Sequence, residues 1–126
     1  MKCMSNSYKL ALLLVGMSAI GCGDSEEDLE VARQSVVAAL EAWKQGETPD
    51  QLQTRTPPIE FHDDDWQNDA KLHDYKVKKV YRDTDGRPRC VVVLSVERRG
   101  GKVVSVQLTY QANTDPKIVI DRDPYS

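Results

Sequence analysis

Long apolar runs, cysteines and aromatic residues are all scarce in this chain. Its 126 residues include three cysteines, and aromatic side chains make up 6% of them. The apolar stretch from Leu10 to Ile20 is shorter than the roughly 20 residues that a helix needs to cross a membrane. A permanent transmembrane helix is therefore not expected.

Clusters of basic residues are missing as well. The chain has 17 Lys and Arg against 20 Asp and Glu, a formal net charge of −3. This balance argues against nucleic-acid binding and against attraction to anionic lipid, both of which depend on grouped cations. The sequence also lacks a nucleophile elbow, a phosphate-binding glycine loop and a set of metal ligands. We therefore predict a protein that is not an enzyme, with no cofactor and no metal site.

The N-terminal segment has the layout of an export signal. Two lysines come first, the apolar run follows, and small residues lead to a cysteine in the sequence Ala19-Ile20-Gly21-Cys22. This ending resembles the lipobox of bacterial lipoproteins, which usually has Leu at the position of Ala19. The resemblance implies cleavage before Cys22 and acylation of its thiol. An ordinary secretory signal and an N-terminal membrane anchor are the alternatives.

Three segments follow from this interpretation. Residues 1–21 are expected to be the signal peptide, residues 22–25 the lipidated cysteine with a short tether, and residues 26–126 a single domain. Its partners would be the membrane, through the N-terminal lipid, and an envelope protein. Gly23 after the cysteine favours the outer membrane, facing the periplasm, if the host has two membranes.

The cysteines predict no disulfide in the domain. Cys3 leaves with the signal and Cys22 is modified, so Cys90 remains alone. It lies in an apolar strand and is interpreted as a small buried side chain, with a redox or nucleophilic role as the alternative.

A helix is predicted over residues 26–45. Ser25 and Asp28 have the spacing of a capping box, and Gly46 is placed to end the helix. Apolar residues recur at steps of three and four, which puts them on one face: Leu29, Ala32, Val36, Ala39, Leu40 and Trp43.

The stretch from Gly46 to Pro58 is predicted to be a proline-rich connection, with one helical turn at Gln51 to Thr54. Ile59 to His62 alternates between apolar and polar residues but is placed outside the sheet. Asp63, Asp64 and Asp65 are expected to form a polar cap before a short turn.

Four strands are predicted after Leu72, with turns at Asp85-Gly86, at Gly100-Gly101 and before Pro116. In the first strand Tyr75, Val77 and Tyr81 alternate with lysines. The inward positions of the other three strands are Cys90, Val92, Leu94, Val96, Val104, Val106, Leu108, Tyr110, Ala112, Ile118 and Ile120. The fold class is therefore α+β, with one amphipathic helix on a four-stranded antiparallel meander.

This element order resembles the cystatin/NTF2-like architecture. The segment from Ala39 to Pro49, the pair Asp65-Trp66 and the strand ending at Pro116 are similar to a group of small exported bacterial lipoproteins of uncharacterised function. In that group the position of Asp69 is often Gly. The resemblance implies a fold and a compartment, with no activity attached.

The densest polar cluster is a candidate cation site. Asp63, Asp65 and Asp74 stand at positions 1, 3 and 12 of an EF-type loop, but Asn68 replaces the turn glycine. A solvated cap and turn is the favoured interpretation. His62 and His73 lack the spacing of a zinc pair and are expected at the surface.

The remaining candidates are aromatic. Tyr110 is the polar-tipped inward strand residue, and its hydroxyl is expected at the rim of the core. Trp43 and Trp66 are assigned to the core, with Trp66 the more exposed, although aromatics at helix ends also line grooves for sugars or peptides. The charged hairpin at Glu97 to Gly101 argues against a cystatin-type inhibitory wedge.

Together these features predict a lipid-anchored, non-enzymatic binding or interaction module of the cell envelope. The alternative is an NTF2-like domain that binds or converts a small molecule in a pocket between helix and sheet. A third possibility is pairing with another protomer through the wet face of the sheet, at Val103, Ser105, Gln107, Thr109 and Gln111.

Overall fold

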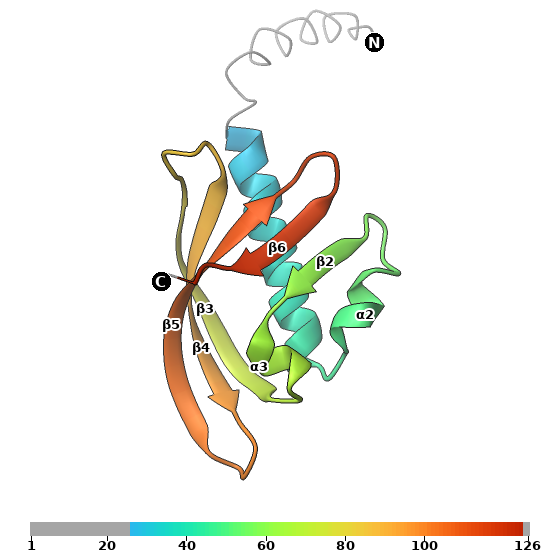
Figure 1. Cartoon of the computed structure of the whole chain (residues 1–126), viewed down its shortest axis with the longest axis vertical. Helices are drawn as coiled ribbons and strands as arrows, with labels where there is room; N and C mark the ends of the chain where they lie inside the picture. Colours follow the sequence, from blue (N-terminus) through green and yellow to red (C-terminus); the bar gives the residue numbers. More distant parts are fainter. Residues whose placement is uncertain (1–25, 125–126) are drawn as a thin grey trace, which may run out of the picture.

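The computed structural model describes residues 26–124. The predicted signal peptide, Cys22 and the tether lie outside this range. The described chain is α+β, with one long helix, residues 26–44, packed on a five-stranded sheet (Figure 1). Among the described residues, no helix combines the length and the apolar character needed to span a bilayer.

Two short helices and five strands follow the long helix. In chain order they are α2 (Pro49–Leu52), β2 (Ile59–His62), α3 (Asp64–Gln67), β3 (Lys71–Arg82), β4 (Pro88–Glu97), β5 (Val103–Asn113) and β6 (Ile118–Arg122). The predicted short helical turn is present as α2, slightly earlier than expected.

The long helix buries the predicted stripe. Ala32, Val36, Ala39 and Leu40 are fully buried and Trp43 is 3% exposed, while Leu29 is half-buried. The helix ends as expected at Gly46, which has a φ of +90°. There the N–H groups of Gly46 and Glu47 bond back to the carbonyls of Trp43 and Ala42, closing a Schellman turn that favours glycine.

The sheet differs from the prediction in one strand. Its order is β2-β6-β5-β4-β3, and β2 pairs with β6 in parallel, with Ile59 opposite Ile118. The prediction of a four-stranded antiparallel sheet that excludes Ile59 to His62 is therefore wrong. The alternation of these residues does reflect a strand, since Ile59 and Phe61 are buried and Glu60 and His62 are not. Its partner lies far along the chain, which local patterning does not reveal.

Strand β3 keeps its apolar side chains inward through two bulges. The pairing with β4 shifts register between Leu72 and Asp74 and again between Val77 and Lys79. Tyr75, Val77 and Val80 consequently pack against the core. The alternation does not continue to Tyr81, because the second bulge reverses the phase and gives the inward place to Val80.

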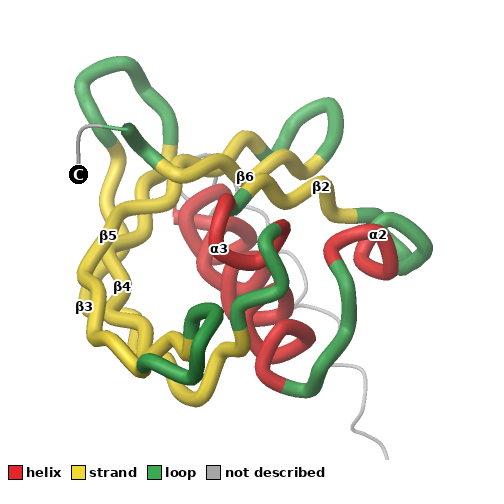
Figure 2. Tube along the Cα trace, turned by 60° about the horizontal axis from the view of Figure 1, so that its bottom comes forward, coloured by secondary structure: helices red, strands yellow, loops and turns green. Residues whose placement is uncertain are grey.

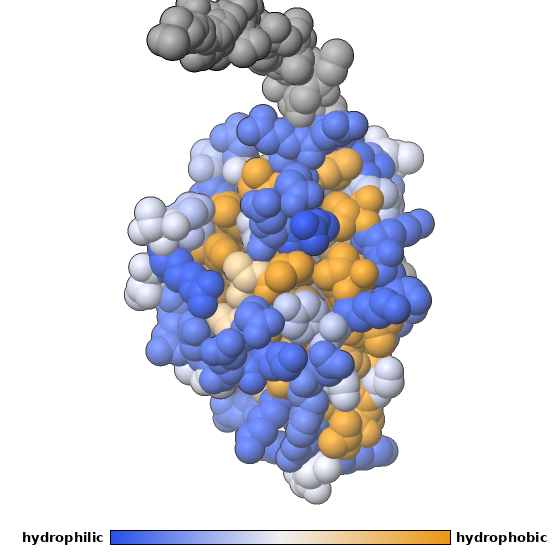
Figure 3. Space-filling model, turned by 180° about the vertical axis from the view of Figure 1, so that it is seen from behind, coloured by the Kyte–Doolittle hydropathy of each residue, from blue (hydrophilic) through white to orange (hydrophobic). Residues whose placement is uncertain are grey.

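The concave face of the sheet holds the core (Figure 2). Cys90, Val92, Leu94 and Val96 of β4 are fully buried, as predicted. Leu108, Tyr110, Ala112 and Ile120 join them, whereas Val104 and Val106 are partly buried at its margin. Seen from behind, the surface shows apolar patches interrupted by polar side chains (Figure 3).

The convex face of the sheet is wet at one end and covered at the other. Val103 is 53% exposed, and Ser105 and Gln107 are exposed. Thr109 is buried, in contrast to the predicted wet face, and its carbonyl accepts a hydrogen bond from the N–H of Asp123 at 2.8 Å. This bond extends the β5–β6 pairing one step beyond Tyr110 and Arg122.

Arg89 of β4 forms ion pairs with Asp123 and with two acids of the β3–β4 turn. Its guanidinium lies 2.8 Å from Asp123, 2.9 Å from Asp83 and 3.0 Å from Asp85, and the residue is 8% exposed. Its Nε has no hydrogen-bond partner. One buried cation thus joins the β3–β4 turn to the chain end after β6.

Candidate functional site

An open groove lies at the C-terminal end of the long helix. Its volume is about 770 Å³, and its walls are two loops. One loop follows the long helix, from Gly46 to Asp50, and the other leads from α3 into β3, from Gln67 to His73. Each loop begins at a Schellman turn, because Asp69 and Ala70 bond back to Trp66 and Asp65 as Gly46 and Glu47 bond back to the long helix.

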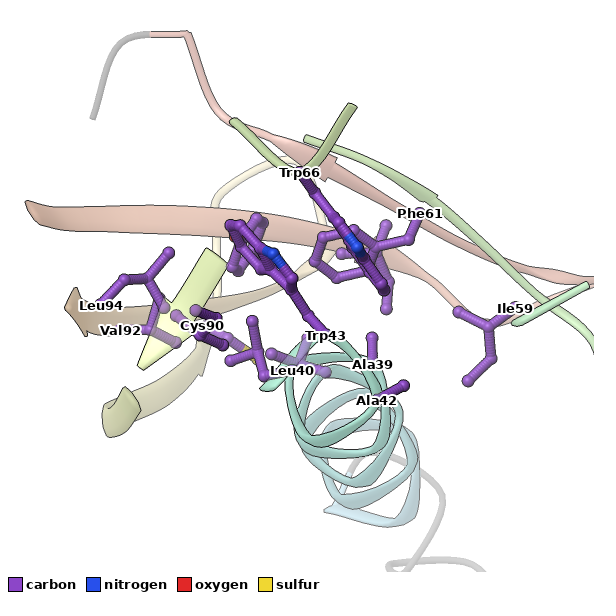
Figure 4. Close-up of a cluster of buried hydrophobic side chains, with 14 of the residues drawn as sticks. Ala39, Leu40, Ala42, Trp43, Ile59, Phe61, Trp66, Cys90, Val92 and Leu94 are labelled. Carbon is purple, nitrogen blue, oxygen red and sulfur yellow. The ribbon is translucent and has the colours of Figure 1, made fainter. Parts of the chain in front are cut away.

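Two tryptophans join these loops. The rings of Trp43 and Trp66 stack with centroids 5.2 Å apart and an interplanar angle of 11° (Figure 4). The indole N–H of Trp43 donates to the carbonyl of Ala70 at 2.8 Å, and that of Trp66 donates to the carbonyl of Glu47 at 3.0 Å. Each helix end therefore holds the loop that follows the other.

The aromatic faces are not free for a ligand. Trp43 is 3% and Trp66 is 4% exposed, so both belong to the core, as predicted. The expectation of partial exposure for Trp66 is wrong. Phe61 contacts Trp66 edge-on. Sugar recognition by ring stacking is therefore not supported at these indoles.

Asp63 fixes α3 at the edge of the groove. Its carboxylate accepts hydrogen bonds from the N–H groups of Asp65 at 2.8 Å and Trp66 at 3.3 Å, which makes it the N-cap. It also accepts the Tyr110 hydroxyl at 2.5 Å. Burial, together with the neighbouring Asp63 carboxylate, raises the pKa of Tyr110. The Tyr110 hydroxyl is thus buried and bonded, not at the rim as predicted.

Asp65 connects α3 to the strands. Its two carboxylate oxygens accept from Nε and Nη2 of Arg98, both at 3.1 Å, and one lies 3.4 Å from Arg122. Asp64 is exposed. These contacts agree with the predicted cap and turn.

The geometry does not bring the proposed calcium ligands together. Asp63 is used in capping and Asp65 in ion pairs, whereas Asp74 lies on β3 at 3.7 Å from Lys44. Within residues 26–124, no group of three or more His, Cys, Asp or Glu side chains is arranged to hold a metal ion.

The two histidines and Cys90 occupy ordinary structural positions. The Nε2 atoms of His62 and His73 lie 2.7 Å from Glu60 and Glu97, respectively, at the surface. Cys90 is fully buried, and burial raises the pKa of its thiol to about 11. A thiol in that state is a poor nucleophile at neutral pH.

The groove offers polar contacts of both signs. Lys44, Lys71 and His73 line it together with Glu47, Asp50 and Asp69. Three of these groups already have partners in the protein, since Lys44 lies 3.7 Å from Asp74, Glu47 3.2 Å from Arg55 and His73 2.7 Å from Glu97. The sequence did not indicate this groove, because its walls are two loops that are distant along the chain.

Comparison of the chain with protein-family models, with curated proteins and with solved structures returned no match.

Proposed function

We propose that this protein is a lipid-anchored domain of the cell envelope that acts as a non-enzymatic binding module. The observation that carries the proposal is the sequence from the apolar run to Cys22, with its small residues before the cysteine. In this proposal the thiol of Cys22 carries the lipid. The domain faces the periplasm from the outer membrane where two membranes exist.

The short distance along the chain between Cys22 and the long helix supports a close attachment. Residue 26 stands four positions after Cys22, and at most ~3.6 Å per residue this stretch reaches ~14 Å. The long helix, residues 26–44, extends ~28 Å at ~1.5 Å per residue. The groove lies at its far end, so an anchored domain would present the groove away from the membrane.

We extend the proposal to the fold family of the domain. We assign the domain to a cystatin/NTF2-like architecture because one long helix lies on the concave face of a curved sheet (Figure 2). Strands β3 to β6 pair in sequence as an antiparallel meander.

Lipid labelling tests the anchor. A Cys22→Ala variant should lose incorporation of radiolabelled palmitate and should leave the membrane fraction. Cys3→Ala and Cys90→Ala are matched controls, since the first changes a cysteine within the signal and the second a buried thiol. Palmitate incorporation that survives Cys22→Ala would refute the proposal.

The alternative is an NTF2-like domain with a ligand pocket between helix and sheet. The Tyr110 hydroxyl would line such a pocket, but it is occupied by Asp63. His62 is exposed outside the core. No observation on the described residues favours this alternative over the binding module.

A further inference from the structure

The turn between β4 and β5 concentrates positive charge. Residues 98–102 read Arg-Arg-Gly-Gly-Lys, so three cations lie within five residues of a chain whose net charge is −3. The nearby acids are Glu97, which stands opposite Val103, and Asp65, which pairs with Arg98. Arg99 and Lys102 are exposed, and within the described chain neither has a hydrogen-bonded or ion-paired side chain. These two cations are available to an external ligand.

The turn is held in one conformation. The N–H of Arg98 donates to the carbonyl of Lys102 at 2.8 Å, and that of Gly101 donates to the carbonyl of Arg98 at 3.0 Å. The Arg98 guanidinium is fixed to Asp65 of α3 by two bonds of 3.1 Å. The backbone of this tip is therefore already ordered and would lose little conformational entropy when a partner binds.

The tip also carries apolar surface and leaves room for close approach. Val103 is 53% exposed, and among residues 26–124 it is the only large hydrophobic side chain that is exposed. Gly100 and Gly101 have φ values of +90° and +81°, and a Cβ added at either position would meet no atom within 4 Å. An extended chain can thus approach the backbone between the two cations.

The hairpin projects at the opposite end of the domain from the start of the long helix (Figure 1). If the N-terminus is anchored, this end points away from the membrane that holds it. The exposed cations are then presented to proteins in the surrounding compartment. An orientation of this kind favours a protein partner over the lipid of the anchoring leaflet.

We infer that residues 98–103 bind an acidic segment of a partner protein, whose carboxylates accept hydrogen bonds from Arg99 and Lys102 while an apolar side chain packs on Val103. Guanidinium and ammonium groups pair well with carboxylates, and charge complementarity of this kind selects partners. The inference rests on the proposed function for its orientation, but the recognition itself does not require the lipid.

A labelled deca-glutamate peptide is the probe for this contact. Binding to the purified full-length protein is followed by fluorescence anisotropy at low salt. The double variant Arg99→Glu/Lys102→Glu should bind about tenfold more weakly, because two attractive contacts become repulsive. The matched control is Lys76→Glu/Lys78→Glu, which makes the same charge change at exposed residues of β3 and should change the affinity less than about twofold.

Two outcomes would overturn the inference. One is an equal loss of peptide affinity in the tip and control variants, which would mean that only net charge matters. The other is tip-dependent binding to phosphatidylglycerol vesicles without binding to the peptide, which would assign the tip to a membrane. Circular dichroism confirms that each variant is folded. The ratio of peptide affinities between the wild-type protein and the tip variant should be the same in a Cys22→Ala background. A failure of the anchor proposal would therefore appear only in the palmitate labelling and would not change this ratio.

Discussion

Asp63 and Arg89 are charged side chains buried at separate places along the sheet, with 1% and 8% of their surfaces exposed. Asp63 accepts hydrogen bonds from two backbone N–H groups of α3 and from the Tyr110 hydroxyl. Its nearest cation, Arg122, lies 3.9 Å away. Neutral donors and the N-terminal end of α3 therefore stabilise the acid.

Arg89 is stabilised in a different way. Three carboxylates surround its guanidinium, and these come from the β3–β4 turn and from the residue after β6. Its Nε remains without a partner. The cost of burying this cation is thus compensated mainly by the opposite charges around it, since its hydrogen bonding is incomplete.

The two arrangements have different consequences for the fold. Asp63 is part of the short segment that it orders, so its bonds are local except for Tyr110. Arg89 instead pairs with acids from two distant parts of the chain, the β3–β4 turn and Asp123, and its removal would leave three acids close together. We therefore expect the two sites to respond unequally to substitution.

The largest effect is expected from Arg89→Met. Loss of one partner from a buried charge group commonly costs several kcal/mol, so the free energy of unfolding should fall by about 3 kcal/mol. Urea denaturation provides the measurement. Arg87→Met is the matched control, because Arg87 also pairs with Asp85, at 3.2 Å, but is exposed. Its loss should stay below about 0.5 kcal/mol, and equal losses in the two variants would contradict this account of Arg89.

A smaller loss is expected from Asp63→Ala. Removal of the cap costs about 1 kcal/mol, and the unpaired Tyr110 hydroxyl adds about 1 kcal/mol. Asp63→Asn keeps an acceptor for the backbone and should lose less than Asp63→Ala. In a Tyr110→Phe background the cost of Asp63→Ala should fall by about 1 kcal/mol. Strict additivity of the two substitutions would show that the Tyr110 contact does not stabilise the fold.

The two sites also differ in how far the sequence predicts them. Asp63 follows an alternating segment and precedes a short turn, so its role as a polar cap was predictable from its neighbours. The helix stripe and the β4 core were predictable for the same reason, since their periodicity is local. Arg89 carried no signal, because its partners stand in a turn and beyond β6. The parallel pairing of β2 with β6 and the groove beside Trp43 are likewise products of distant contacts.

The smallest effect concerns the aspartate at the other end of α3. Asp69 has a φ of +66°, and it closes the same kind of turn as Gly46, whose φ is +90°. Because a side chain is strained in this region, Asp69→Gly should raise the free energy of unfolding by about 0.5 kcal/mol. Gly46→Ala should lower it by about 1 kcal/mol, which makes it the reciprocal control.

Asp69→Gly also tests whether the acids flanking α3 have separate roles. The Asp63 carboxylate holds the helix start through hydrogen bonds, whereas the backbone conformation at Asp69 is what closes the turn, through the N–H groups of Asp69 and Ala70. Glycine can make those same backbone bonds without strain. A loss of stability in Asp69→Gly, measured by urea denaturation beside Asp63→Ala, would mean that the Asp69 side chain contributes as Asp63 does.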